Sequence, residues 1–188
     1  MMNNVKSVEN ESLILNSLVT NGSIEEIMNL NLASQETSFM IGEVAEVFEG
    51  ISVNPKYLQT DEDIKGISYI KPSSIKYWEL LKGKYYIKEE FANKYDKKLL
   101  KVGDILISKI FDGYNCAIVR DERLKAIASK NVIIIRCTKM NPQILFNAIA
   151  FNEGKQIFLK SIKERGRGYD IKYINKEIIN GIRLPYKI

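Results

Sequence analysis

The 188-residue sequence has no histidine, two cysteines, four prolines and one tryptophan. Without histidine, Ser-His-Asp and Cys-His catalysis are excluded, and the commonest metal ligand is missing. Cys116 and Cys137 lie in apolar runs, so we expect two buried free thiols rather than a disulfide or a zinc site. No stretch approaches the roughly 18 apolar residues of a membrane helix, and the polar, acidic N-terminus does not follow the signal-peptide pattern. We therefore expect a cytoplasmic protein that has no contact with a membrane.

Familiar catalytic and cofactor-binding motifs are also missing. The sequence has no GxxxxGK[ST] phosphate loop, no GxGxxG, and no Asn-Pro-Pro-aromatic or Asp-Pro-Pro-aromatic tetrapeptide of amino-group methyltransferases. Glu153-Gly154-Lys155 matches part of a metal-dependent nuclease motif, with Asp112 or Asp121 as a conceivable second carboxylate. We favour solvated residues at a helix kink, because the glycine would interrupt the strand that such a motif needs. The prediction is a protein without catalytic residues, metal or cofactor; the nuclease alternative predicts Mg²⁺-dependent cleavage that Glu153→Gln abolishes.

Charge is unevenly distributed along the chain. The first 40 residues contain one lysine and five acidic residues, whereas residues 41–188 contain 27 basic and 18 acidic residues. A basic body indicates a polyanionic partner. The alternative is a solvated lysine-rich surface, and charge alone does not distinguish the two.

The sequence predicts an N-terminal helical arm over residues 1–38 and a second domain over residues 39–188. Apolar residues cluster at 13–19, Asn21-Gly22 ends that helix, and Ser23 with Glu26 forms a capping box for a second one. Glu25 and Glu26 lie where a DNA-reading helix would meet phosphates. We therefore expect this helical hairpin to pack on protein rather than to read DNA.

Residues 39–188 have the pattern of an α+β domain. Alternating or apolar runs predict strands at 41–50, 105–110, 115–120, within 126–137 and at the end of 178–185, and a strand that begins at 67 and ends at Pro72. Asn141-Pro142 predicts a helix start, with Leu145 and Ile149 on the apolar face and an interruption at Gly154. The aromatic-rich segment 77–96 has no assignable periodicity.

A basic, glycine-interrupted segment near the C-terminus is the best candidate for binding. Arg165 and Arg167 flank Gly166, and Gly168 follows. Glycine allows positive φ or close approach of a ligand, and guanidinium groups fit phosphate oxygens or the O6 and N7 atoms of guanine. Tyrosines next to lysines recur through the basic region, a combination suited to contacting nucleic acid. The alternative for these arginines is a basic surface turn.

Five segments, in order, resemble the target-recognition domain of the type I restriction-modification specificity (S) subunit. They are IGEVAEVFEGISVNP, LLKVGDILISKI, AIASKNVIIIRC, NPQILFNAIAFNEGKQIFLK and INKEIINGIRLP. The matching residues are Leu100, Gly103, Asp104, Ile105, Leu106 and Ser108, then Ala128, Ser129 and Asn131, and finally Ile182, Leu184 and Pro185. We interpret Gly103, Asp104 and Ser108 as structural: a turn, its cap and a strand start.

The resemblance implies a single target-recognition domain with a twisted mixed and antiparallel β core and flanking helices. It also implies sequence-specific binding of double-stranded DNA without catalysis. The implied partners are an N6-adenine methyltransferase subunit, which flips and methylates the target base, and a restriction subunit. Family members usually have two such domains separated by long helices, and this sequence has one. We therefore expect a half-subunit that forms a homodimer, a solitary reader, or a module of a larger adenine methyltransferase or methylase-nuclease. A protein-interaction module that works through the N-terminal arm is the remaining alternative.

Four loops are the predicted DNA-binding segments: 52–57, 71–74, 109–115 and 163–172. The predicted DNA-binding residues are Asn54, Lys56, Tyr57, Lys71, Ser73, Ser74, Lys109, Tyr114, Asn115, Lys163, Arg165, Arg167, Tyr169 and Lys172. Among them we favour Lys109, Tyr114, Asn115, Arg165 and Arg167. Lysines and arginines would neutralise phosphates, and the four loops would provide specificity by contacting base edges in the major groove.

Overall fold

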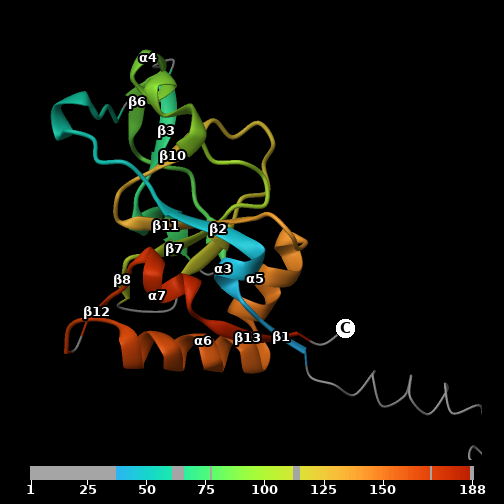
Figure 1. The fold of residues 1–188 in the computed structure, drawn as a ribbon. Coiled ribbons are helices and arrows are strands. Elements are labelled where there is room, and N and C mark those ends of the chain that lie inside the picture. Colours follow the sequence, from blue (N-terminus) through green and yellow to red (C-terminus); the bar gives the residue numbers. More distant parts are fainter. Residues whose placement is uncertain (1–36, 61–65, 77, 112–114, 170, 187–188) are drawn as a thin grey trace, which may run out of the picture. The chain divides into compact units, whose positions relative to one another are not determined.

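The computed structural model describes residues 37–60, 66–76, 78–111, 115–169 and 171–186. Residues Ser38–Tyr186 form one unit, shown in Figure 1. The predicted helical arm at 1–38 lies almost entirely outside the described residues. In the part of the chain that is described, no helix combines the length and apolarity needed to cross a bilayer.

A four-stranded antiparallel sheet is the centre of this unit. Its order is β2 (Ala45–Glu49), β11 (Val132–Cys137), β7 (Ile105–Ser108) and β9 (Cys116–Ile118). Both faces of the inner strands are buried, because alternate side chains point to opposite faces. In β7, Ile105 and Ile107 join one core cluster and Leu106 joins another. The apolar runs that predicted strands are therefore strands covered on both sides.

Helices cover one face of the central sheet (Figure 1): α5 (Pro142–Ala150), α6 (Asn152–Arg165) and α7 (Lys176–Asn180). Asn141 caps α5 by accepting a 2.8 Å hydrogen bond from the Gln143 backbone N–H, as its Asn-Pro sequence predicted. The predicted interruption at Gly154 is wrong, since the helices separate at Phe151 and Gly154 lies inside α6. A Cβ at Gly154 would lie 2.1 Å from the Ala148 carbonyl oxygen, so this glycine is needed for close packing of α6 on α5.

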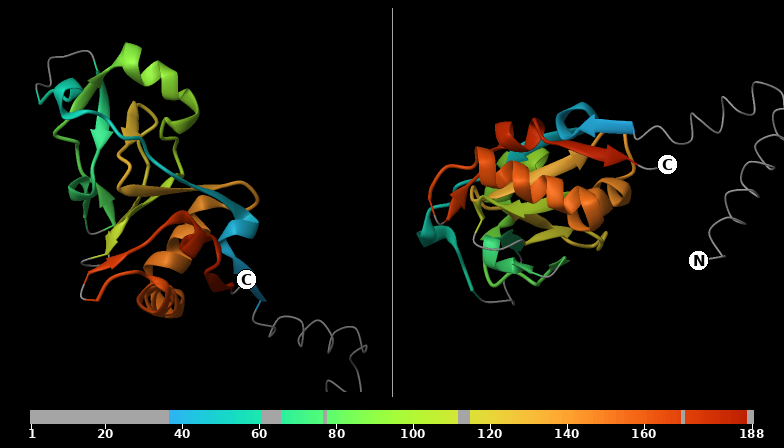
Figure 2. Two further views of the ribbon diagram at one scale, coloured as in Figure 1. Left: turned by 60° about the vertical axis from the view of Figure 1, so that its left-hand side comes forward. Right: turned by 90° about the horizontal axis from the view of Figure 1, so that it is seen from below.

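A second, three-stranded sheet lies over the other face of the central sheet (Figure 2). Its order is β10 (Ala126–Ala128), β3 (Gly66–Ile70) and β6 (Tyr86–Lys88), with β10 parallel and β6 antiparallel to β3. The segment that sequence periodicity left unassigned contains β5 (Glu79–Leu80), β6, α4 (Glu89–Ala92) and η3 (Asn93–Lys98). Within it, Trp78 has a positive φ of 72°.

Short elements complete the architecture. Three of them are strand pairs: β1 (Thr37–Met40) with β13 (Arg183–Tyr186), β4 (Ile75–Lys76) with β5, and β8 (Ile110–Phe111) with β12 (Lys172–Tyr173). Two others are the helical turns η1 (Pro55–Tyr57) and η2 (Pro72–Ser74). The continuous strand predicted over 41–50 is wrong in its first half. Residues Ile41–Val44 form α3, where the Glu43 carboxylate accepts a 2.7 Å hydrogen bond from the Met40 backbone N–H. The expected α+β class, with antiparallel and mixed sheets, is confirmed.

Both cysteines are free thiols, as the sequence predicted. Cys116 is buried, and Cys137 is only half-buried. Burial, with a contribution from the charge of Asp104, raises the pKa of the Cys137 thiol to about 11. The thiol is therefore protonated and weakly nucleophilic at neutral pH.

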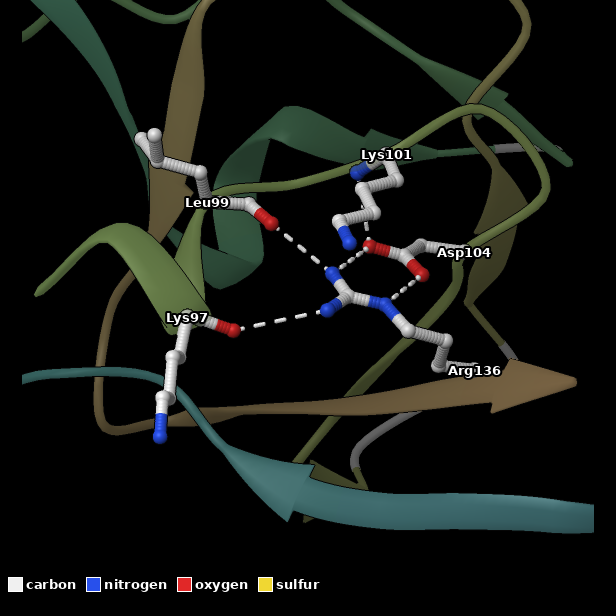
Figure 3. Close-up of polar contacts among 5 residues, drawn as sticks. All are labelled: Lys97, Leu99, Lys101, Asp104 and Arg136. Atoms are coloured by element: carbon white, nitrogen blue, oxygen red, sulfur yellow. Dashed lines mark hydrogen bonds and ion pairs between the residues drawn. The ribbon is translucent and has the colours of Figure 1, made fainter. Parts of the chain in front are cut away.

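A buried ion pair joins β7 and β11 at one end (Figure 3). Asp104 is 1% exposed and accepts hydrogen bonds from Arg136 Nε at 2.8 Å and Nη2 at 2.7 Å. Nη2 also donates to the Leu99 carbonyl oxygen at 2.8 Å, and the Lys101 backbone N–H donates to Asp104 Oδ2 at 2.8 Å. Asp104 hydrogen bonding raises the pKa of Arg136. The predicted capping role of Asp104 is confirmed, and its arginine partner, 32 residues away, is an addition.

Candidate nucleic-acid interface

The turn at residues 129–131, here called the junction turn, connects β10 to β11 and anchors three of the four predicted loops. The Lys130 N–H donates to the Ile51 carbonyl oxygen at 2.8 Å, at the base of loop 52–57. The Ser129 N–H donates to the Ile70 carbonyl oxygen at 2.8 Å, at the base of loop 71–74. The Asn131 carbonyl oxygen accepts from the Lys109 N–H at 2.9 Å, at the start of loop 109–115. Loops far apart in sequence thus begin from one place.

The fourth loop joins the same region through a short strand pair. β12 pairs with β8, and the Ile174 N–H donates to the Lys109 carbonyl oxygen at 3.0 Å. In Figure 1 and in the left view of Figure 2, η1, η2 and the β8–β12 pair lie along one side of the unit. The structure therefore brings the described parts of all four predicted loops to one side of residues 38–186.

Loop 52–57 has a capped and packed conformation. The Asn54 side chain accepts a 3.1 Å hydrogen bond from the Lys56 backbone N–H and so begins η1. Tyr57 is 49% exposed, and its ring stacks on Phe91 with 5.8 Å between centroids. The Lys56 ammonium lies 4.9 Å from the centre of the same ring. Asn54 therefore has a structural role, while Lys56 and Tyr57 face solvent.

Loop 71–74 presents two of its three predicted residues. Lys71 is partly exposed, with its ammonium 3.4 Å from the centre of the Tyr85 ring, a favourable cation–π contact. Ser73 is exposed, whereas Ser74 is 7% exposed and belongs to the interior. Lys71 and Ser73 are the residues of this loop with surface accessible to a ligand.

Loop 109–115 begins with a hydroxyl turn and an ion pair. Ser108 lies at the end of β7 rather than at its start, and its hydroxyl donates to the Ile110 carbonyl oxygen at 2.7 Å. Lys109 donates to Glu49 Oε1 at 2.8 Å, and the two side chains are 25% and 33% exposed. Asn115 is partly exposed, and Tyr114 lies outside the described residues. The favoured lysine of this loop is thus already paired with a carboxylate.

Loop 163–172 uses one of its two arginines for structure. Arg165 Nη1 donates to the Gly181 carbonyl oxygen at 2.9 Å, directly after α7. Arg167 is exposed, and its backbone pairs with Tyr173 through two hydrogen bonds of 3.0 and 2.7 Å. Gly168 has a φ of +105°, which favours glycine. The exposed side chain of Arg167 therefore extends from a backbone position that is held by its pairing with Tyr173.

The remaining predicted residues of this loop differ in accessibility. Lys163 is exposed at the end of α6, and Tyr169 is 95% exposed. Lys172 is partly exposed and donates to the Gly168 carbonyl oxygen at 2.6 Å. Lys163 and Tyr169 thus add exposed polar and aromatic surface beside Arg167.

A lysine-rich cavity beside loop 52–57 was missed from the sequence. Its volume is about 570 Å³, and its lining includes Lys56, Tyr57, Lys88, Phe91 and Lys94. Lys88 ends β6, and Phe91 lies in α4. The aromatic and lysine content of segment 77–96 was a signal, but without periodicity it could not be placed next to loop 52–57.

The residues of the nuclease alternative lie in a helix. Glu153 and Lys155 are both in the first turns of α6, where a strand would be needed to place a carboxylate beside a second acid. Within the described ranges, no three histidine, cysteine or acidic side chains are placed to hold one metal ion.

Comparison with known proteins finds similar solved structures, but no protein-family profile and no curated protein matches the sequence. A chain from a structure on complex assembly and conformational transition of the type I R-M system matches 96% of this chain at 13% identity, with a TM-score of 0.58. The HsdS subunit from Thermoanaerobacter tengcongensis matches 96% at 12% identity, with a TM-score of 0.53.

The present chain spans 42% and 44% of the length of these two neighbours. The likeness covers nearly all of this chain, and at this identity it concerns the fold. The chain therefore has the fold found in the specificity subunits of type I restriction-modification systems, the family that its sequence resembles.

Proposed function

We propose that this protein recognises a specific sequence in double-stranded DNA as a half specificity subunit of a type I restriction-modification system. It performs no reaction itself and directs an N6-adenine methyltransferase, together with a restriction subunit, to the target. The observation that supports this proposal best is the convergence of four separate loops, three of them on the junction turn, along one side of a basic domain. Such clustering of loops on a rigid scaffold is typical of binding surfaces.

The proposed division of labour follows from accessibility. Lys56, Lys71 and Lys163 contact phosphates, which gives salt-dependent affinity. Arg167 and Asn115 read base edges, because arginine and asparagine present paired hydrogen-bonding groups to guanine and adenine. Arg165 positions the loop through its bond to the Gly181 carbonyl oxygen.

The proposed assembly follows from the single recognition domain that the sequence resemblance implies. Family members usually have two such domains, so we propose that this domain, which matches less than half of each neighbouring chain, reads one half of a two-part target. A second copy of the chain would read the other half as a homodimer.

The direct test is selection of the full chain against a random duplex pool at low ionic strength, alone and with a type I methyltransferase subunit. Recovery of a motif of a few base pairs supports the proposal. The absence of any duplex binding under both conditions would overturn it.

Arg167→Ala tests the loop assignment. Loss of a bidentate base contact is worth about 1–3 kcal/mol, so we expect roughly 5- to 150-fold weaker discrimination at one position of the motif. Arg123→Ala is the matched control, because its side chain is 94% exposed in the turn after β9. An unchanged motif in Arg167→Ala would return this arginine to the class of basic surface residues. Arg165→Ala is less informative, because it also removes a structural hydrogen bond.

A further inference from the structure

The cavity beside loop 52–57 has the chemistry of a site for the DNA backbone. Its lining contains three lysines, Lys56, Lys88 and Lys94, and one acidic residue, Glu90. All four are exposed. Clustered ammonium groups with one carboxylate leave a net positive charge, and lysine contacts phosphate as a point charge.

Aromatic packing holds the two sides of this cavity together. Tyr57 from η1 stacks on Phe91 from α4, and Phe91 contacts Tyr95 with 5.6 Å between ring centroids. The Lys56 ammonium lies 4.9 Å from the centre of the Tyr57 ring. Phe91 and Lys56 both lie against the Tyr57 ring, which therefore helps to hold loop 52–57 against α4.

The cavity lies next to a predicted base-reading loop but is built mainly from other elements. Gln59, two residues beyond η1, forms a bridge with Tyr86 of β6, through hydrogen bonds of 3.0 and 2.8 Å. β6 leads directly to Lys88 and α4. The backbone therefore fixes Lys88 and Lys94 beside loop 52–57 rather than on the helical side of the unit.

We infer that Lys88 and Lys94, together with Lys56, form a phosphate-binding site that grips the DNA backbone beside the base-reading loops. This inference rests on the proposed function and extends it to residues outside the four loops. The site adds affinity and fixes the register of the duplex without contributing to sequence choice, because phosphates are the same at every base pair.

The test compares two double variants of the full chain on the selected duplex. Lys88→Ala with Lys94→Ala removes two lysines of the cavity. Lys101→Ala with Lys139→Ala removes the same charge from exposed lysines beyond the ends of β7 and β11 that lie away from the junction turn. Affinity is measured by fluorescence anisotropy as a function of salt, with thermal unfolding as the check on folding.

Each neutralised phosphate contributes about 0.9 to the slope of log affinity against log salt. We expect the magnitude of this slope to be about 1.8 smaller in the cavity variant than in the unmodified protein. Raising the salt from about 50 to about 200 mM should then weaken binding by a factor roughly tenfold smaller than in the unmodified protein. The control should keep the slope of the unmodified protein, and the selected motif should be the same for all three. Equal slopes in the two variants overturn the inference and leave the proposed function standing. A motif altered in the cavity variant also overturns it, because the lysines would then be reading bases. An unmodified protein that binds no duplex ends both proposals.

Discussion

The two ends of the β7–β11 strand pair are built differently. At one end, Asp104 and Arg136 form a bidentate pair in which the carboxylate is 1% and the arginine side chain 17% exposed. At the other end, Lys109 and Glu49 form a single contact at 2.8 Å, with side chains 25% and 33% exposed. Water therefore reaches the second pair and is largely excluded from the first.

This difference indicates that the two ends of one strand pair contribute unequally to the stability of the fold. Removing one partner of a buried ion pair leaves an uncompensated charge, whereas an exposed pair contributes about 0–1 kcal/mol. The Asp104–Arg136 end is therefore committed to holding the fold. In the proposed function, the Lys109 end contains charged groups that DNA can recruit at small cost, next to the junction turn.

The largest expected effect is on the Asp104–Arg136 end. Asp104→Asn leaves Arg136 without its carboxylate, so we expect the free energy of unfolding to fall by about 3–5 kcal/mol in urea titrations. Duplex affinity of the folded protein, measured well below the unfolding transition, should change little.

Replacing both partners sharpens this test. Asp104→Leu combined with Arg136→Met removes both charges, so the double variant should be more stable than Asp104→Asn. A double variant that is less stable than the single one would show that the pair contributes more than mutual charge compensation.

An intermediate effect is expected at Gly50, whose backbone packs closely against the start of the junction turn. A Cβ there would lie 2.1 Å from the Ala128 carbonyl oxygen and 2.4 Å from that of Ser129. Gly50→Ala must displace backbone at the bases of the loops, at a cost of about 1–3 kcal/mol. We expect Gly50→Ala to reduce duplex affinity more than Asp104→Asn does, when both variants are measured as folded protein. Stability loss with unchanged binding would mean that the loops do not depend on the junction turn.

The smallest effect is expected at the partly exposed Lys109–Glu49 pair, where two substitutions should act in opposite directions. Lys109→Ala removes a cation of the proposed DNA interface and should weaken duplex binding, whereas Glu49→Gln releases Lys109 and removes a negative charge. We expect Glu49→Gln to strengthen binding roughly two- to fivefold at low salt, and the gain to vanish at high salt. Each should change stability by less than about 1 kcal/mol. Binding that weakens in both variants would mean that the ion pair itself shapes the loop.

Local features of the sequence predicted much of the fold. Asn141-Pro142 set the start of α5, and the Val102-Gly103-Asp104 turn preceded an apolar strand, since capping and turn chemistry act over a few residues. The errors also have local causes. Residues 41–44 alternate like the strand that follows them, and Gly154 is a helix breaker by propensity but is required here by contact with Ala148.

The sequence indicated which residue types the candidate site contains, but not how the fold places them relative to one another. Glycine-flanked arginines indicated a presented loop, and Arg167 occupies such a loop. The sequence did not indicate that Arg165 would be bound to the Gly181 carbonyl oxygen, that Ser74 would be buried, or that Lys88 would lie beside loop 52–57. Each depends on a neighbour that is remote along the chain.

The sequence by itself determined the lack of histidine chemistry, the positive charge of the main domain and the type of most secondary-structure elements, because these depend on composition and on short-range periodicity. The tertiary structure decided which loops share a side and which charged groups are already bound. Arg136 meets Asp104 across 32 residues, Lys109 meets Glu49 across 60, and Arg165 meets Gly181 across 16. Periodicity specifies which face of a strand or helix is buried, but it does not specify which distant segment packs against that face, so these pairings follow from the fold alone.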